Sequence, residues 1–151
     1  NKVSILTQTT LSLDEINPII DKIKEKYPEV EIPRKDDVCY ATQNRQDSIK
    51  EIARIADLVL VIGADISSNS RRLDDVSKRI NPRTYLIESY NDINKYWLND
   101  VKKLGITLSA SAPEFLLEET LQYLELDYGK FNIVNQDKID EGIKFKPLTL
   151  K

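Results

Sequence analysis

The sequence predicts an α/β protein with a mainly parallel sheet, built as three-layer units. Two observations predict this class: short, continuous apolar segments, and amphipathic segments of helical period that alternate with them. The clearest apolar segments are residues 58–62, 84–87 and 104–108. We expect one complete unit at 36–126, the trailing half of a preceding domain at 1–35, and a C-terminal tail at 127–151 that docks elsewhere.

The segment before the complete unit predicts one strand and one helix. Residues 3–6 are apolar enough for a buried strand, and the helix after them is expected to end at Pro28. Ser12 and Glu15 form a capping-box pattern at its start. Pro18 favours a split, with Asn17 as a second cap. The apolar face of this helix is expected to hold Ile19, Ile20, Ile23 and Tyr27.

Within the complete unit, a helix is expected before or after each strand. The helix before 58–62 turns Ile49, Ile52, Ala53 and Ala56 inward, and the helix after it turns Leu73, Val76 and Ile80 inward. A short helix with Ile93 and Trp97 is expected after 84–87. The helix after 104–108 carries Phe115, Leu117, Leu121 and Leu124. Strand-like pieces at 131–134 and 143–145 close the chain.

Composition excludes several classes of function. The net charge of −3 over 151 residues gives no support for nucleic acid or a membrane surface as the main partner, and no apolar run approaches a membrane span. The absence of histidine removes Ser-His-Asp and Cys-His catalysis and His-ligated zinc within this chain. The chain begins at Asn1 and has no methionine, so we expect a processed, trimmed or partial chain. Its single cysteine fits a reducing, cytosolic compartment.

Small hydroxyl and amide side chains gather in three turns between a strand and a helix, at 7–10, 67–70 and 109–111. Such turns meet at the carboxyl edge of a parallel sheet, where helix N-termini attract anions. The alternative is plain helix capping, for which Ser111 followed by Pro113 and Glu114 is suited. Gly63 is isolated, so neither a P-loop nor a dinucleotide fingerprint is present.

Cys39 allows two interpretations. A lone cysteine is most often a small buried apolar residue. Cys39 instead stands in a polar segment before a predicted helix, near Arg34, Lys35 and Arg45. Positive charge and a helix N-terminus favour the thiolate, which is the form that ligates iron.

The order and spacing of four motifs resemble the 4-hydroxy-3-methylbut-2-enyl diphosphate reductase (LytB) family. The motifs are residues 7–12, 33–46, 67–70 with Arg72 and Leu73, and 110–114. The resemblance implies a pseudo-symmetric enzyme of three similar α/β domains around a cavity, each giving one cysteine to a 4Fe–4S cluster with one iron open to substrate. It makes Cys39 the third cluster ligand. It places Ser67, Ser68, Asn69 and Ser111 at the diphosphate and Thr9 near the hydroxymethyl end of the substrate.

The activity implied by this resemblance is reductive dehydroxylation to isopentenyl and dimethylallyl diphosphate, with electrons from a ferredoxin or flavodoxin. The family's other cysteines, its histidines and its acidic proton donor lie in the N-terminal half, so this chain alone is expected to be inactive. The implied location is the cytoplasm or a plastid. Ser109 departs from the family's usual glycine. The rival interpretations are a non-catalytic module that binds a phosphorylated metabolite and a nucleotide-binding regulatory domain, for which the fingerprint is missing.

Overall fold

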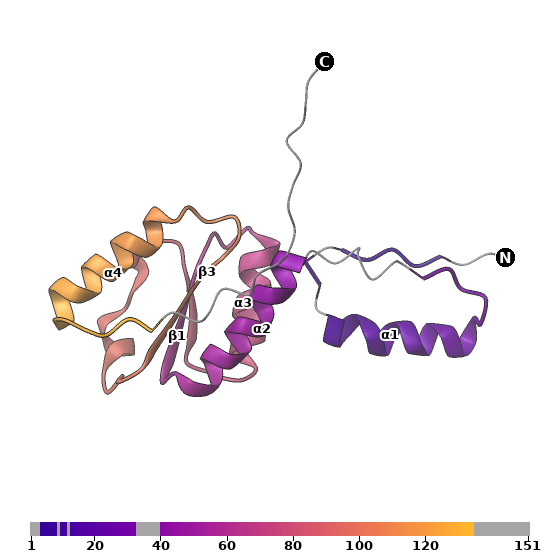
Figure 1. Ribbon diagram of the computed structural model, residues 1–151, viewed down its shortest axis with the longest axis horizontal. Helices are drawn as coiled ribbons and strands as arrows, with labels where there is room; N and C mark the ends of the chain where they lie inside the picture. The colour runs from indigo at the N-terminus through magenta and orange to yellow at the C-terminus, as the bar shows by residue number, and fades with distance from the viewer. Residues whose placement is uncertain (1–3, 9, 12, 33–39, 135–151) are drawn as a thin grey trace, which may run out of the picture.

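The computed structural model describes residues 4–8, 10–11, 13–32 and 40–134, which form an α/β unit preceded by a separate helix (Figure 1). The α-helices are α1 (Leu13–Lys26), α2 (Tyr40–Ile55), α3 (Ser68–Lys78) and α4 (Phe115–Tyr128). The strands are β1 (Leu58–Ile62), β2 (Thr84–Ile87) and β3 (Leu104–Leu108). Two short 3-10 helices connect β2 to β3, namely η2 (Tyr90–Asp92) and η3 (Lys95–Leu98).

The sheet is parallel and has the order β2-β1-β3, so β1 is its central strand. Val59 is in register with Thr84 of β2 and with Gly105 of β3. Every residue of β1 is buried, as expected of a strand with a neighbour on each side and helices on both faces. The predicted strands at 58–62, 84–87 and 104–108 are confirmed at these bounds.

Alternate residues of β1 enter two separate cores. Val59 and Val61 pack with Ile49, Ala53, Leu73 and Val76, which come from α2 and α3. Leu58, Leu60 and Ile62 pack with Ile87, Ile93 and Leu124 on the face that α4 covers. Figure 1 shows α2 and α3 on one side of the strands and α4 on the other. The predicted three-layer α/β class is therefore confirmed, while the domain boundaries stay predictions.

The predictions before the unit were less accurate. Ser4 forms only an isolated parallel bridge with Glu31, so the strand predicted at 3–6 is wrong for the residues that are described. A strand needs a ladder with a neighbour, and residue 31 supplies one bridge alone. The predicted split at Pro18 is also wrong, because α1 runs through it from Leu13 to Lys26. Local sequence disfavours proline at this position, but the loss of one helical hydrogen bond did not end the helix.

Three further predictions need correction. The short helix expected around Ile93 and Trp97 is two 3-10 helices, and Ile93 lies between them. Ile80 lies beyond the last residue of α3 and is partly exposed, so it is not part of the inward face of that helix. Residues 131–134 form no strand. They have no neighbouring strand in the described part of the chain, and the predicted piece at 143–145 lies outside that part.

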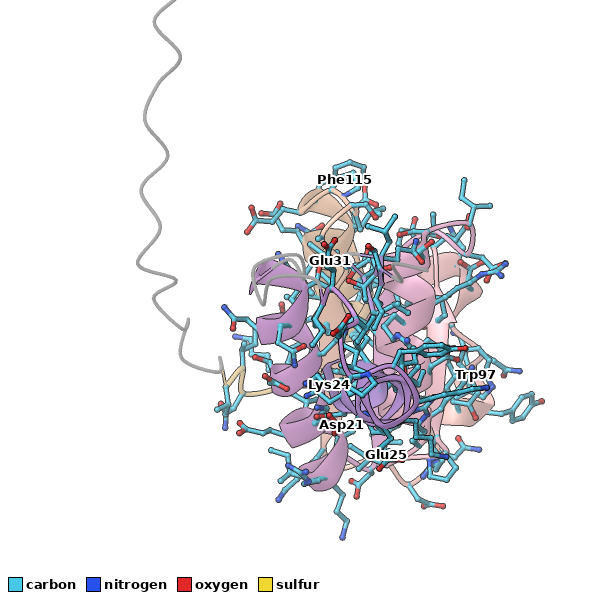
Figure 2. The ribbon with its side chains drawn as sticks, turned by 90° about the vertical axis from the view of Figure 1, so that its right-hand side faces the viewer. Asp21, Lys24, Glu25, Glu31, Trp97 and Phe115 are labelled. Atoms are coloured by element: carbon cyan, nitrogen blue, oxygen red, sulfur yellow. The ribbon has the colours of Figure 1, made fainter. Side chains whose placement is uncertain are left out.

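Ion pairs fasten α1 to the unit. Glu15 pairs with Arg72 of α3 and with Arg79, the residue that follows α3. The Lys50 ammonium on α2 lies 2.6 Å from the Asp14 carboxylate. Burial raises the pKa of the Glu15 carboxyl, but the guanidinium groups of Arg79 and Arg72 lower it by more than burial raises it. The pKa of Glu15 therefore lies below its ordinary value. Figure 2 views α1 along its axis, with the exposed residues Asp21, Lys24 and Glu25 labelled around it.

Candidate functional site

Two loops at the carboxyl edge of the sheet bring small polar side chains together. One loop follows β1 and leads into α3, and the other follows β3 and leads into α4. Because β1 and β3 are parallel neighbours, their carboxyl ends meet at one edge. Phe115, labelled in Figure 2, marks the beginning of α4 at this end of the molecule. We use the name serine edge for the serine and asparagine residues of the two loops and of the first turn of α3: Ser67, Ser68, Asn69, Ser70, Ser109 and Ser111.

A continuous chain of hydroxyl groups joins the two loops. The Ser70 hydroxyl donates to Ser109 Oγ at 2.9 Å, and Ser109 Oγ lies 3.3 Å from Ser111 Oγ. Ser111 Oγ lies 3.1 Å from Ser67 Oγ, which accepts a hydrogen bond from the backbone N–H of Ser70 at 3.3 Å. The structure thus brings Ser67 and Ser111, which are 44 residues apart in sequence, within hydrogen-bond distance.

Gly63 makes room for this chain of hydroxyls. It directly follows β1, and its N–H continues the ladder by donating to the carbonyl of Ile87 at 2.9 Å. A Cβ at this position would lie 2.3 Å from Ser70 Oγ and 2.6 Å from Ser109 Oγ. Both distances are shorter than the contacts that Cβ atoms make in real proteins. The two buried hydroxyls therefore occupy space that only glycine leaves free.

Asn69 is the most unusual member of the serine edge. Only 8% of it is exposed, yet neither Nδ2 nor Oδ1 of its side-chain amide has a hydrogen-bond partner in the described part of the chain. A buried polar group without a partner costs about 1–3 kcal/mol, and native structures tolerate few of them. Asn69 lies in the first turn of α3, between Ser68 and Ser70. An unsatisfied amide in this position is expected where a ligand completes the hydrogen bonding.

The capping alternative holds for one loop and fails for the other. Ser67 is the N-cap of α3, and its side chain accepts from the N–H of Ser70. The N-cap of α4 is Glu114, which makes no side-chain capping bond. The capping role considered for Ser111 is therefore wrong. Its hydroxyl instead lies within hydrogen-bond distance of Ser67 and Ser109, and α4 begins later than the capping-box pattern predicted.

The third hydroxyl-rich turn lies against α2. Gln46 is fully buried, and its Nε2 donates to the backbone carbonyl of Thr10 at 3.3 Å. Thr9 and Cys39 lie outside the described residues, although Cys39 directly precedes Tyr40, the first residue of α2. The predicted roles of Thr9 and Cys39 therefore stay predictions.

Sequence reasoning missed Gln46. It occupies the same helical stripe as Thr42, Ile49 and Ala53, with spacings of four, three and four residues, and all of these are buried. Polar residues on an otherwise apolar stripe would have been the signal for it. Gln46 Oε1 also lacks a hydrogen-bond partner among the described residues.

Two negative findings apply only to residues 4–134 with their undescribed gaps left aside. No group of three or more His, Cys, Asp or Glu side chains there could hold a metal ion. No helix in that part of the chain is both long enough and apolar enough to cross a membrane.

Fold and site together define a parallel α/β protein whose hydroxyl and amide groups gather at the sheet edge where proteins of this class bind ligands. The family model described as LytB protein matches residues 1–125. The chain belongs to the LytB family.

Several relatives carry the name 4-hydroxy-3-methylbut-2-enyl diphosphate reductase. The relative from Wigglesworthia glossinidia brevipalpis is 46% identical over 155 residues, which cover 100% of this chain and 49% of the relative. The relative from Dechloromonas aromatica is 45% identical over 143 residues, which cover 95% of this chain and 46% of the relative. The chain thus spans about half the length of the curated relatives it matches.

Solved structures agree with the family assignment. The E-1-hydroxy-2-methyl-but-2-enyl-4-diphosphate reductase from Plasmodium falciparum matches with a TM-score of 0.84 and 33% identity, over 93% of this chain and 44% of that one. A second structure, of (E)-4-hydroxy-3-methyl-but-2-enyl diphosphate reductase, matches with a TM-score of 0.58 and 33% identity over 83% of this chain. Both are structures of named reductases, and this chain corresponds to part of each.

Proposed function

We propose that this chain is the C-terminal portion of a 4-hydroxy-3-methylbut-2-enyl diphosphate reductase and that its serine edge holds the diphosphate of the substrate. The observation that carries the proposal is Asn69, whose buried amide has no partner, beside two serine hydroxyls that meet 3.1 Å apart from separate loops. The names of the relatives suggest the substrate, and the geometry of the serine edge supports binding of an anionic group there.

The serine edge offers the donors that a diphosphate requires. Phosphate oxygens accept hydrogen bonds, and the hydroxyls of Ser67, Ser68 and Ser111 and the Nδ2 group of Asn69 can donate them. The first N–H groups of α3, at Ser68 and Asn69, make no hydrogen bond to the described part of the chain. Together with the positive end of the α3 dipole they favour an anion without any cationic side chain.

Two proposed residues complete the site from segments that the structure does not describe. Cys39 is proposed as one ligand of a 4Fe–4S cluster, since the following residue begins α2 and a helix N-terminus stabilises a thiolate. Thr9 is proposed to lie near the hydroxymethyl end of the substrate, in a turn that Gln46 holds at Thr10. One cysteine cannot hold such a cluster, so the remaining ligands must come from outside this chain.

The proposed reaction breaks the allylic C–O bond of the substrate. It consumes two electrons and two protons and releases water, together with isopentenyl or dimethylallyl diphosphate. A bound cluster supplies the electrons, which it receives from a ferredoxin or flavodoxin. This chain contributes binding and orientation: the serine edge fixes the anionic end, so that the hydroxyl end faces the segment that contains Thr9. The chain alone is expected to be inactive.

Replacing Cys39 in the intact protein tests the proposal. We expect Cys39→Ser to lose the visible absorbance of the cluster and the turnover of 4-hydroxy-3-methylbut-2-enyl diphosphate, because serine is a poor ligand for iron in such clusters. Undiminished absorbance and turnover would refute the role of Cys39. Tight binding of inorganic pyrophosphate by an intact wild-type protein without any turnover would favour the non-catalytic module instead.

A further inference from the structure

We propose that Ser109 is a positioning residue that aims the hydroxyl hydrogens of the serine edge at the ligand. The inference rests on the proposed function of that edge and names a residue that does not itself reach the diphosphate. Ser109 is 1% exposed, and its Oγ lies in the middle of the hydroxyl chain, between Ser70 and Ser111.

The number of hydroxyl hydrogens limits how the serines of this edge can bond to one another. A serine hydroxyl has one hydrogen to donate and two lone pairs to accept with. Ser70 is fully buried, and it donates its only hydroxyl hydrogen to Ser109 Oγ at 2.9 Å. Ser109 therefore acts as an acceptor on its Ser70 side, and its own hydrogen is left for Ser111 Oγ at 3.3 Å.

This order fixes the direction of the next group. Since Ser111 accepts from Ser109, its own hydrogen points away from Ser109, toward Ser67 Oγ or a ligand. Ser67 Oγ already accepts from the N–H of Ser70, so its hydrogen also points away from α3. The two hydroxyls then hold two hydrogens for the single Ser67–Ser111 contact of 3.1 Å. An anion can accept both.

Removing the Ser109 hydroxyl undoes this order. Ser70 would lose its acceptor and turn to a backbone carbonyl of the preceding turn, as serines in helices do. Ser111 would lose the donor that holds its lone pair, and its hydrogen would sample orientations that face away from the ligand. Binding would then require ordering a free hydroxyl, which weakens affinity without moving any group that touches substrate.

Inhibition by inorganic pyrophosphate in the intact, cluster-loaded enzyme tests the inference. We expect Ser109→Ala to raise both the Ki of pyrophosphate and the KM of substrate by about 3- to 10-fold, the worth of one net hydrogen bond, while kcat stays unchanged. Ser109→Gly removes the same hydroxyl and is expected to raise Ki as Ser109→Ala does. Because glycine is the family's usual residue here, an unchanged Ki in this well-tolerated variant would overturn the inference.

Ser77→Ala is the matched control. Ser77 is as deeply buried as Ser109, and its hydroxyl lies 2.8 Å from Thr84 Oγ1, but it lies in α3 at the end of the helix away from the serine edge. We expect it to lower the thermal midpoint about as much as Ser109→Ala and to leave Ki and KM unchanged. If Ser109→Ala behaves like Ser77→Ala, Ser109 is structural only and the inference is overturned.

A double-mutant cycle shows whether Ser109 acts through Ser111. In a Ser111→Ala background, Ser109→Ala is expected to change Ki by less than about 2-fold, because the group it orients is already gone. Full additivity of the two changes would overturn the inference while leaving the site intact. If pyrophosphate does not compete with substrate and Ser67→Ala leaves KM unchanged, the proposed diphosphate site itself fails and the inference fails with it.

Discussion

Two asparagines, one on α3 and one just after it, are almost equally buried. The side-chain amide of one is fully hydrogen-bonded, and that of the other has no partner among the described residues. Asn81, after the end of the helix, is 9% exposed, and its Nδ2 donates to the carbonyl of Ala56 at 2.8 Å while its Oδ1 accepts from the N–H of Arg83 at 2.9 Å. Asn69, in the first turn, is 8% exposed, and neither side-chain atom has a partner among the described residues.

The serines near these asparagines differ in the same way. Ser77 and Thr84 bond to each other at 2.8 Å, and Thr84 also donates to the carbonyl of Asn81 at 2.7 Å. That end of α3 is a closed network that joins helix and sheet. At the other end, the single contact of 3.1 Å between the Ser67 and Ser111 hydroxyls can use only one of their two hydrogens. The network at Asn81 is closed by its own hydrogen bonds, whereas we propose that a ligand completes the hydrogen bonding at Asn69.

Gly63→Ala is expected to have the largest effect on both stability and binding, because its added methyl group would enter the space that the serine edge occupies. The new Cβ would displace the hydroxyls of Ser70 and Ser109, which lie 2.3 and 2.6 Å from its position. We expect the free energy of unfolding to fall by about 1–3 kcal/mol, as in other overpacked sites, and the Ki of pyrophosphate to rise more than 10-fold. Thermal unfolding and inhibition kinetics on the intact protein measure the two effects.

Gly105→Ala is its control. A Cβ there would lie 2.4 Å from Ile52 Cγ2, in the core between the sheet and α2. A comparable loss of stability with unchanged Ki is expected for this variant. Equal Ki values for the two glycine variants would contradict the view that Gly63 shapes a binding site.

Asn69→Ala separates binding from stability. The change removes two buried atoms without partners, so the thermal midpoint is expected to stay level or rise. The KM of substrate and the Ki of pyrophosphate are expected to rise by about 10- to 100-fold, the worth of a hydrogen bond to a charged group. A lowered midpoint with unchanged kinetics would mean that Asn69 belongs to the fold rather than to the site.

Asn81→Ala is expected to do the reverse. It leaves the carbonyl of Ala56 and the N–H of Arg83 without their partners, so we expect a loss of about 1–3 kcal/mol in the free energy of unfolding. Because Asn81 is at the far end of α3 from the serine edge, KM should stay within error of the wild type. A raised KM here would remove the contrast between the two ends.

Glu15→Gln is expected to have the smallest effect on stability. It removes the ion pairs by which α1, outside the α/β unit, contacts Arg72 and Arg79. The folded-state pKa of Glu15 is below its ordinary value of 4.5. The pairing with Arg72 and Arg79 therefore stabilises the fold fully above that value, and its contribution is lost as pH falls through the lowered pKa. We expect wild type to exceed Glu15→Gln in stability by about 1 kcal/mol or less at neutral pH, with the gap closing in acid. A gap that is independent of pH would contradict the pairing.

The sequence alone predicted the strands of the sheet correctly, because burial of apolar side chains dominates their formation. Continuous apolar runs at 58–62, 84–87 and 104–108 form the strands because burial on both faces leaves such a run no alternative. The sequence did not predict local structure correctly where contacts with residues far along the chain determine it. Pro18 lies inside α1, and residues 4–6 contribute a single bridge in place of a ladder, against local preference in both cases. Nothing local to Ser111 shows that its hydroxyl meets Ser67 rather than capping α4.

The site was partly predictable for the same reason. Ser67 and Ser111 were placed at one edge by the topology of a parallel sheet, which sequence alone suggests. The unpartnered amide of Asn69 and the contact from Gln46 to Thr10 depend on packing between α2, α3 and the loops, which no local pattern encodes. The roles of Cys39 and Thr9 rest on the family motifs.

A crystal structure of the intact, cluster-loaded protein with its diphosphate substrate would show whether the serine edge holds the diphosphate. We expect diphosphate oxygens within hydrogen-bond distance of Ser67 Oγ, Ser111 Oγ and Asn69 Nδ2, with the hydroxyl chain from Ser70 to Ser111 intact behind them. A diphosphate bound elsewhere, with the amide of Asn69 still unpaired, would contradict it.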